Sequence, residues 1–262
     1  MKNISDRKRI VVKVGTSTLT HRTGMLNIRR VEQLVKTLAD IQNSGHEVIL
    51  VSSGAIGLGM GKLGLRERPK DTPGKQACAA VGQCELMYLY DNLFAEYSIT
   101  VAQMLLTKYI LLEDRRKNVE NAMERLIAHG VIPIINENDT VAIDELELEV
   151  GENDSLAATV AAIAKADLLI IMSDIDGLYD KDPHTYDDAR LIPVVHEITD
   201  DIRALAGGAG TNLGTGGMIT KLNAVEIAYD SDIDVVLMNG QHPKTLYDLF
   251  DGKTVGTFFC KK

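Results

Sequence analysis

The chain has 262 residues, 45% of them hydrophobic and 25% charged, as in ordinary globular proteins and unlike disordered chains. Its formal net charge of −9 argues against a nucleic-acid or anionic-membrane surface, although a locally basic site could still bind a small anion. We find no signal peptide and no stretch of roughly 18 apolar residues, so the sequence predicts a cytoplasmic protein without a membrane span.

Apolar runs alternate with segments of helical periodicity from the N-terminus onward. Strands are predicted at 9–15, 47–54, 99–106, 131–139, 167–177 and 232–240. Helices are predicted at 27–44, with Asn27 as the cap, and at 72–97, 115–129 and 218–229. Continuous apolar strands separated by helices indicate an α/β fold, with a mostly parallel sheet covered by helices on both faces.

Two segments interrupt this alternation. In 142–154, glutamates alternate with Leu146, Leu148 and Val150, which is typical of a half-exposed strand in a hairpin arm. The segment 176–193 is rich in turn-forming residues and is interpreted as an excursion from the sheet.

The cysteines and histidines predict neither a disulfide nor a zinc site. Cys78, Cys84 and Cys260 form no CxxC motif, which favours free thiols in a reducing compartment. The six histidines show no ligand spacing, so a zinc site is not expected.

Polar residues and glycines follow several of the predicted strands. They are Gly15-Thr16-Ser17, Ser52-Ser53-Gly54, Asn136 to Asp139 and Ser173-Asp174. Because ligands of open α/β sheets bind at the carboxyl ends of the strands, these clusters predict one extended site.

The stretch LGTGGMITK (213–221) places a glycine turn before a predicted helix. It does not match a Walker A loop, because Lys221 follows Thr220 rather than a glycine. A glycine turn that opens a helix exposes backbone N–H groups and suits phosphate, while a flexible surface loop is the alternative.

Three charged or polar positions each allow two interpretations. Lys13 lies between Val12 and Val14 in the first strand, where it either meets an anion or extends outward from a sheet edge. Lys221 is either a phosphate ligand or an ordinary helix-surface lysine. Asn153 can cap the helix that follows it, bind a ligand, or do both. Two lysines from opposite ends of the chain would suit phosphoryl transfer.

Eight motifs in order then resemble those of the glutamate 5-kinase branch of the amino acid kinase family. They are VVKVGTS, VSSGAIGLG, AAVGQ, AQMLLT, PIINENDTV, GENDSLAA, DIDGLY and GTGGMITK. The likeness runs from about residue 9 to residue 260. It implies a three-layer α/β/α sandwich around a sheet of about eight strands, as a single domain over 1–262. Within it, about 1–165 would bind the amino acid and about 166–262 would bind ATP.

The resemblance also implies roles for individual residues. Lys13, Lys221 and Asp154 would be catalytic, with Asp154 orienting the lysines. Glutamate would be bound by Ser53, Gly54, Ala55, Asp139 and Asn153. ATP would be bound by Lys13, Gly15, Ser173, Asp174, Thr215, Gly216, Gly217, Met218, Ile219, Thr220 and Lys221. No residue is predicted as a firm protein ligand of a metal; Mg²⁺ would act with ATP.

The implied reaction is phosphorylation of the γ-carboxylate of L-glutamate by ATP, the first step of proline biosynthesis. Proline inhibition, assembly into dimers or tetramers and hand-off to glutamyl phosphate reductase are further implications. Alternatives are a sister kinase acting on acetylglutamate, aspartate, carbamate or UMP, and a non-catalytic sensor of ATP and an amino acid. The sequence departs from the family pattern in carrying Ser173 where threonine is common, in a longer arm before Asp154, and in ending without the PUA domain of many bacterial members.

Overall fold

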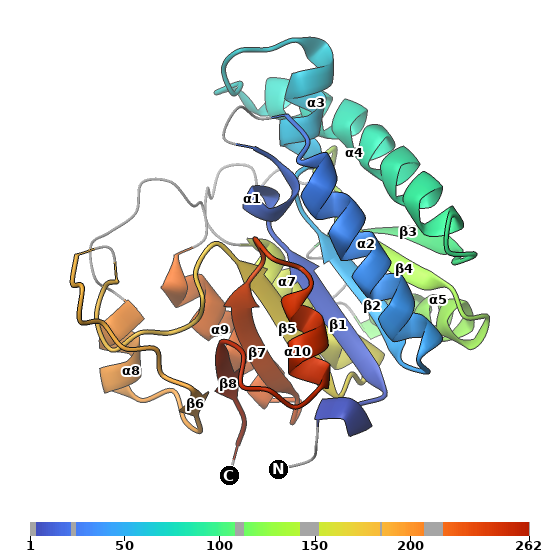
Figure 1. Ribbon diagram of the computed structural model, residues 1–262. Helices are drawn as coiled ribbons and strands as arrows, with labels where there is room; N and C mark the ends of the chain where they lie inside the picture. Colours follow the sequence, from blue (N-terminus) through green and yellow to red (C-terminus); the bar gives the residue numbers. More distant parts are fainter. Residues whose placement is uncertain are drawn as a thin grey trace.

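The computed structural model describes residues 4–21, 25–107, 113–141, 152–183, 185–206 and 217–261. These residues form an eight-stranded sheet with helices on both faces (Figure 1). The strands are β1 (Arg9–Val14), β2 (Glu47–Ser52), β3 (Val101–Leu106), β4 (Ile132–Glu137), β5 (Leu168–Ser173), β6 (Val194–Val195), β7 (Asp234–Asn239) and β8 (Thr257–Phe259). The α/β class and the predominantly parallel sheet are confirmed.

The helices surround this sheet in two layers. They are α1 (Thr16–Leu19), α2 (Ile28–Asn43), α3 (Ala55–Leu63), α4 (Thr72–Ala95), α5 (Glu113–Ala128), α7 (Glu152–Ala164), α8 (Asp200–Ala206), α9 (Met218–Tyr229) and α10 (Thr245–Phe250), preceded by a short 3₁₀ turn (Ile4–Asp6). One buried apolar cluster joins the sheet to α2, α4 and α10, and a second joins the opposite face to α5, α7 and α9. The three-layer arrangement is thereby confirmed.

The strand order is β3-β4-β2-β1-β5-β7-β8-β6. All pairs are parallel except β7 with β8. Strands that precede residue 140 thus form one half of the sheet, and strands that follow residue 167 form the other half. β1 lies at the junction, where Lys13 is in register with Val51 of β2 and Ile171 of β5. The sheet-edge interpretation of Lys13 is therefore wrong, because β1 is a central strand.

Most helix boundaries follow from local signals. The Asn27 side chain accepts a hydrogen bond from the Arg30 N–H and caps α2, whose buried face repeats at helical spacing. Asp71 caps α4 through the Gly74 N–H, with Pro73 in the first turn. α9 begins and ends at the predicted residues.

Helix α3 was not predicted, because its sequence AIGLGMGKL contains three glycines, which are poor helix formers. The glycines permit direct contact between the backbones of α3 and α4. A Cβ atom on Gly59 would lie 1.8 Å from the Cys78 carbonyl oxygen, and one on Gly82 would lie 1.7 Å from the Ala55 carbonyl oxygen. Tertiary packing thus stabilises a segment with low intrinsic helix propensity.

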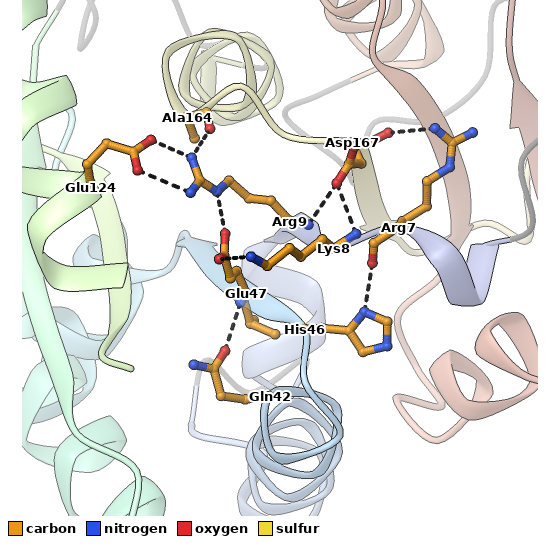
Figure 2. A network of polar contacts seen from close by, with 10 residues as sticks. Arg7, Lys8, Arg9, Gln42, His46, Glu47, Glu124, Ala164 and Asp167 are labelled. Atoms are coloured by element: carbon orange, nitrogen blue, oxygen red, sulfur yellow. Dashed lines mark hydrogen bonds and ion pairs between the residues drawn. The ribbon is translucent and has the colours of Figure 1, made fainter. Parts of the chain in front are cut away.

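A network of ion pairs covers the amino ends of the central strands (Figure 2). Arg9 donates to Glu47 at 2.7 Å and to the Ala164 carbonyl at 2.5 Å, and it also pairs with Glu124. The Asp167 carboxylate accepts from the backbone N–H groups of Lys8 and Arg9, each at 2.9 Å. These contacts connect β1 with β2, α5 and the start of β5.

The three cysteines are free thiols, as predicted. Within the described ranges, no helix is both long and apolar enough to traverse a bilayer.

Candidate active site

Two lysines and an aspartate from three distant segments meet at the carboxyl edge of the sheet. Lys13 comes from the penultimate position of β1, Asp154 from the first turn of α7 and Lys221 from the first turn of α9. Lys13 Nζ lies 2.6 Å from Asp154 Oδ1, and Lys221 Nζ lies 3.4 Å from Asp154 Oδ2. All three residues are buried, with Asp154 only 1% exposed. The structure thus brings together the three residues predicted to be catalytic.

The lysines keep Asp154 ionised. Burial alone would raise the pKa of the Asp154 carboxyl, but the charges and hydrogen bonds of Lys13 and Lys221 outweigh burial and hold that pKa below its ordinary value. The carboxylate in turn draws both ammonium groups to one place. A buried cluster of this kind costs desolvation free energy, and such clusters are frequent at functional sites.

The first turn of α9 continues the site from Lys221. Gly217 is the N-cap and, having no side chain, makes no side-chain cap hydrogen bond to the N–H groups of the turn. The Thr220 hydroxyl donates to the Gly217 carbonyl at 2.7 Å and lies 3.4 Å from Asp154 Oδ2. Met218 also belongs to this turn, and the Ile219 side chain is exposed.

Two predicted nucleotide-binding residues, Thr215 and Gly216, lie outside the described residues. The glycine turn at 213–216 and most of the predicted arm, 142–151, also lie outside them.

Other predicted residues follow the carboxyl ends of their strands. A Cβ atom on Gly15, which is the N-cap of α1, would lie 3.7 Å from Lys13 Nζ, so its backbone borders the lysine. Ser173 ends β5, and its hydroxyl donates to Asp174 at 3.0 Å. Gly54 adopts φ 98°, a left-handed conformation that favours glycine, and Ala55 begins α3 directly after it.

The predicted amino-acid-binding residues Ser53 and Asn153 are in direct contact. The Asn153 amide Nδ2 donates to Ser53 Oγ at 2.7 Å, and it also lies 3.3 Å from Asn136 Oδ1. Asp139 follows β4 and is partly buried. The structure thus joins two of these residues, Ser53 and Asn153, by a direct hydrogen bond.

The interpretation of Asn153 as the helix cap is wrong. Helix α7 begins at Glu152, so Asn153 lies inside its first turn, and its side chain bonds to the ends of β2 and β4 instead of to its own helix.

Sequence reasoning gave no individual role to two participants in this amide cluster, although it placed Asn136 among the polar residues at the end of a strand. Asn136 is 2% exposed, and its Nδ2 donates to Gln83 Oε1 at 2.9 Å. Both residues fall within motifs already noted, PIINENDTV and AAVGQ, but Gln83 has the helical spacing of a core position, and only the fold places it beside Asn136.

The described residues contain no group of three or more His, Cys, Asp or Glu side chains that could hold a metal ion. Asp154, the acidic residue at the centre of the site, is already paired with two lysines. Mg²⁺ commonly binds through one or two carboxylates and phosphate oxygens and keeps several waters, so this donor set is compatible with Mg²⁺ that arrives with a phosphate ligand.

Comparisons with known proteins agree with this architecture. Residues 8–239 match the model of the amino acid kinase family. The chain is 52% identical to a glutamate 5-kinase of Clostridium perfringens, over 100% of this chain and 98% of that protein. It is 53% identical to a glutamate 5-kinase of Clostridium tetani, over 98% of this chain and 96% of that protein.

A solved structure extends the likeness at the level of fold. Carbamate kinase from Giardia lamblia bound to AMP-PNP superposes with a TM-score of 0.68 at 18% identity, over 99% of this chain and 100% of that one. From these matches, the chain belongs to the amino acid kinase family, in the branch of the glutamate 5-kinases.

Proposed function

We propose that this protein transfers the γ-phosphoryl group of ATP to the γ-carboxylate of L-glutamate and releases ADP and L-glutamyl 5-phosphate. The observation that carries the proposal is the buried Lys13–Asp154–Lys221 cluster at the carboxyl edge of the sheet, in a chain of this branch. The reaction would be the first step of proline biosynthesis, in the cytoplasm.

The chemistry needs no general base. A glutamate side chain has an ordinary pKa near 4.3, so its carboxylate is already ionised at neutral pH. One carboxylate oxygen attacks the γ-phosphorus, and the bond from that phosphorus to the bridging β–γ oxygen breaks in line with it. The electron pair of that bond leaves with ADP. No proton changes place in this step.

Charge repulsion is the main obstacle to this attack. Two unit charges of the same sign 4 Å apart repel by about 4 kcal/mol at an effective dielectric constant of 20. The ammonium groups of Lys13 and Lys221 offset this repulsion and stabilise the transferring phosphoryl group. Asp154 orients both ammonium groups, since its two oxygens meet one lysine each.

The nucleotide would occupy the half of the sheet formed by about 166–262. Thr215, Gly216 and the first turn of α9, from Gly217 to Lys221, would hold the phosphates, and Gly15 would add a backbone N–H. Ser173 and Asp174 would line the same site from the end of β5. Mg²⁺ would arrive on the phosphate oxygens and neutralise part of their charge.

Glutamate would occupy the half formed by about 1–165. Gly54 and Ala55 would supply backbone N–H groups. The Ser53 hydroxyl would donate to a substrate carboxylate, and Asp139 and Asn153 would accept from the α-ammonium group. This acidic and amide lining favours glutamate over acetylglutamate, which has no free ammonium group.

Further features belong to the same proposal and rest on family membership. These are inhibition by proline, assembly into dimers or tetramers, and hand-off of the acyl phosphate to glutamyl phosphate reductase. These three features involve surfaces or ligands other than the Lys13–Asp154–Lys221 cluster.

The test is an ADP-release assay with hydroxylamine present to trap the acyl phosphate as a hydroxamate. We expect glutamate-dependent ADP and an equal amount of hydroxamate, and no comparable signal with acetylglutamate, aspartate, carbamate or UMP. Preference for one of these would identify a sister kinase. Binding of ATP and glutamate by calorimetry without turnover would instead indicate a sensor.

A further inference from the structure

A chain of hydrogen bonds connects helix α4 to the proposed glutamate site. Asn136 Nδ2 donates to Gln83 Oε1 at 2.9 Å, Asn153 Nδ2 lies 3.3 Å from Asn136 Oδ1, and Asn153 Nδ2 donates to Ser53 Oγ at 2.7 Å. The four side chains come from α4, β4, α7 and the turn after β2. Gln83 is the member furthest from the turn that carries Ser53.

The position of Gln83 is fixed by close packing. Its neighbour Gly82 approaches the Ala55 carbonyl so closely that an added Cβ atom would lie 1.7 Å from it. Since Ala55 begins α3 directly after Ser53 and Gly54, α4 is held against the turn that carries Ser53. Gln83 is 8% exposed, so its carboxamide has little room to reorient.

In this series of hydrogen bonds, the donor and acceptor sides of one amide determine which side of the next amide faces it. Because Gln83 Oε1 accepts from Asn136 Nδ2, the Asn136 carbonyl oxygen faces the Glu137 N–H, at 2.9 Å, and Asn153 Nδ2. Asn153 points its NH₂ group toward Asn136 Oδ1, the Ser52 carbonyl and Ser53 Oγ, and its Oδ1 lies on the other side of the planar amide. Ser53 Oγ accepts from Asn153, which leaves the Ser53 O–H to donate elsewhere.

A carboxamide at position 83 has a cost that an apolar side chain would avoid. Gln83 Nε2 is buried and has no hydrogen-bond partner among the described residues. An unpaired buried N–H group lowers stability, whereas methionine would fill a similar volume without the penalty. Local features that lower stability in this way are expected at functional sites.

We propose that Gln83 is a positioning residue for glutamate, an inference that rests on the function proposed above. Its carbonyl oxygen holds the NH₂ side of Asn136, as the Glu137 N–H holds its oxygen side, and so supports the polarity of the Asn136–Asn153–Ser53 chain. As a result the site presents an acceptor, Asn153 Oδ1, to the α-ammonium group, and a donor, the Ser53 hydroxyl, to a carboxylate. Without the acceptor at position 83, the buried Asn136 NH₂ group loses its partner, and the Glu137 N–H and Asn153 alone hold the amide, so both groups are held less firmly.

The test compares three variants of the full chain by steady-state kinetics and thermal unfolding. Gln83→Met removes the acceptor. Gln83→Glu keeps an oxygen that can accept from Asn136 and replaces the unpaired NH₂ group with a second carboxyl oxygen, which adds a negative charge when the group is ionised. Gln76→Met, two turns earlier on α4, makes the same chemical change away from the hydrogen-bonded chain and serves as the control.

For Gln83→Met we expect the KM for glutamate to rise about tenfold, as for loss of one directed hydrogen bond. Its kcat and KM for ATP should stay close to the wild-type values, and its Tm should change little, because the variant leaves the Asn136 NH₂ group unpaired but removes the unpaired Gln83 NH₂ group. Gln83→Glu should recover most of the glutamate affinity, and Gln76→Met should leave all constants unchanged. This split separates positioning from packing, because a packing defect lowers Tm and affects both substrates.

Two results would overturn the inference. One is an unchanged KM for glutamate in Gln83→Met. The other is an equal loss of Tm and activity in Gln83→Met and Gln83→Glu, which would assign Gln83 to packing alone. A wild-type protein with no glutamate-dependent ADP release would refute the proposed function, and this inference with it.

Discussion

The two edges of the central sheet carry charge in different ways. At the amino edge, one arginine, Arg9, meets two carboxylates and a carbonyl, and Asp167 accepts from two backbone N–H groups (Figure 2). At the carboxyl edge, two buried lysines converge on a single carboxylate, Asp154. The same strand β1 runs from one edge to the other, with Arg9 and Lys13 separated by about 13 Å.

This difference separates stability from function. The amino edge connects strands and helices through acceptors that match its donors, which is typical of a structural network. The carboxyl edge concentrates cations where strands end and helices begin, which is where α/β sheets bind ligands. Substitutions at the amino edge should therefore lower the unfolding free energy alone, whereas substitutions at the carboxyl edge should change kcat or a substrate KM, with or without a loss of stability.

The largest effect is expected from Asp154→Asn, which leaves two buried ammonium groups without their shared carboxylate. Removing one member of a buried ionic cluster typically costs about 3–5 kcal/mol of unfolding free energy. Urea denaturation measures this loss, and kcat should fall as well because the lysines lose their orientation. An unfolding free energy equal to that of the wild type would contradict the role of Asp154 in holding the cluster.

The pH dependence of the unfolding free energy, compared between this variant and the wild type, tests the direction of the Asp154 pKa shift. Because the pKa of Asp154 is lowered in the folded protein, its stabilising contribution is complete above the unfolded carboxyl pKa of about 4. It is lost as pH falls through the lowered folded pKa. Asp154→Asn should lack this component of acid destabilisation.

The next largest effect is expected from Lys221→Ala, which removes a cation from the transferring phosphoryl group. We expect kcat to fall about 100- to 1,000-fold, as for loss of one preorganised stabilising group, with little change in the KM for glutamate. Lys165→Ala is the matched control, since that lysine is exposed and pairs with Glu120. A near-normal kcat would exclude Lys221 from the mechanism.

A smaller effect, confined to one substrate, is expected from Asp139→Ala. Loss of a contact to the substrate ammonium group should raise the KM for glutamate about 10- to 100-fold and leave the KM for ATP unchanged. Asp91→Ala, an exposed change on α4, is the control. If only the KM for ATP rises, the assignment of the two halves of the sheet is reversed.

The smallest effect is expected at the amino edge. Asp167→Ala leaves the N–H groups of Lys8 and Arg9 without their acceptor and should lower the unfolding free energy by about 1–3 kcal/mol. The kcat should be unchanged, and Asp167→Asn, which retains an acceptor oxygen, should lose less stability. A large fall in kcat without loss of stability would abolish the distinction between the edges.

Local sequence signals were enough for much of the fold. Alternation of apolar runs with helical periodicity found the central strands, and the cap Asn27 and the helix start at Thr72-Pro73 located the first residues of α2 and α4. Helix α3 escaped prediction because its stability comes from the contact of Gly59 and Gly82 with neighbouring backbone, which local propensity does not encode.

The same distinction between local signals and tertiary contacts applies to the residues of the candidate site. Lys13 was a candidate because a lysine inside an apolar strand is costly, and Lys221 because it follows a glycine turn, but only the family resemblance implied catalytic roles for them. Gln83 was not, since a glutamine within a helical repeat resembles any other core-facing position. Its contact with Asn136, 53 residues away in the chain, depends on how α4 packs beside β4.

The most direct test of the account is a crystal structure with a non-hydrolysable ATP analogue, Mg²⁺ and glutamate. We predict that Lys13 Nζ and Lys221 Nζ both lie within hydrogen-bond distance of the triphosphate, with the γ-carboxylate of glutamate in line with the terminal phosphorus. A complex in which both ammonium groups point away from the triphosphate would contradict it.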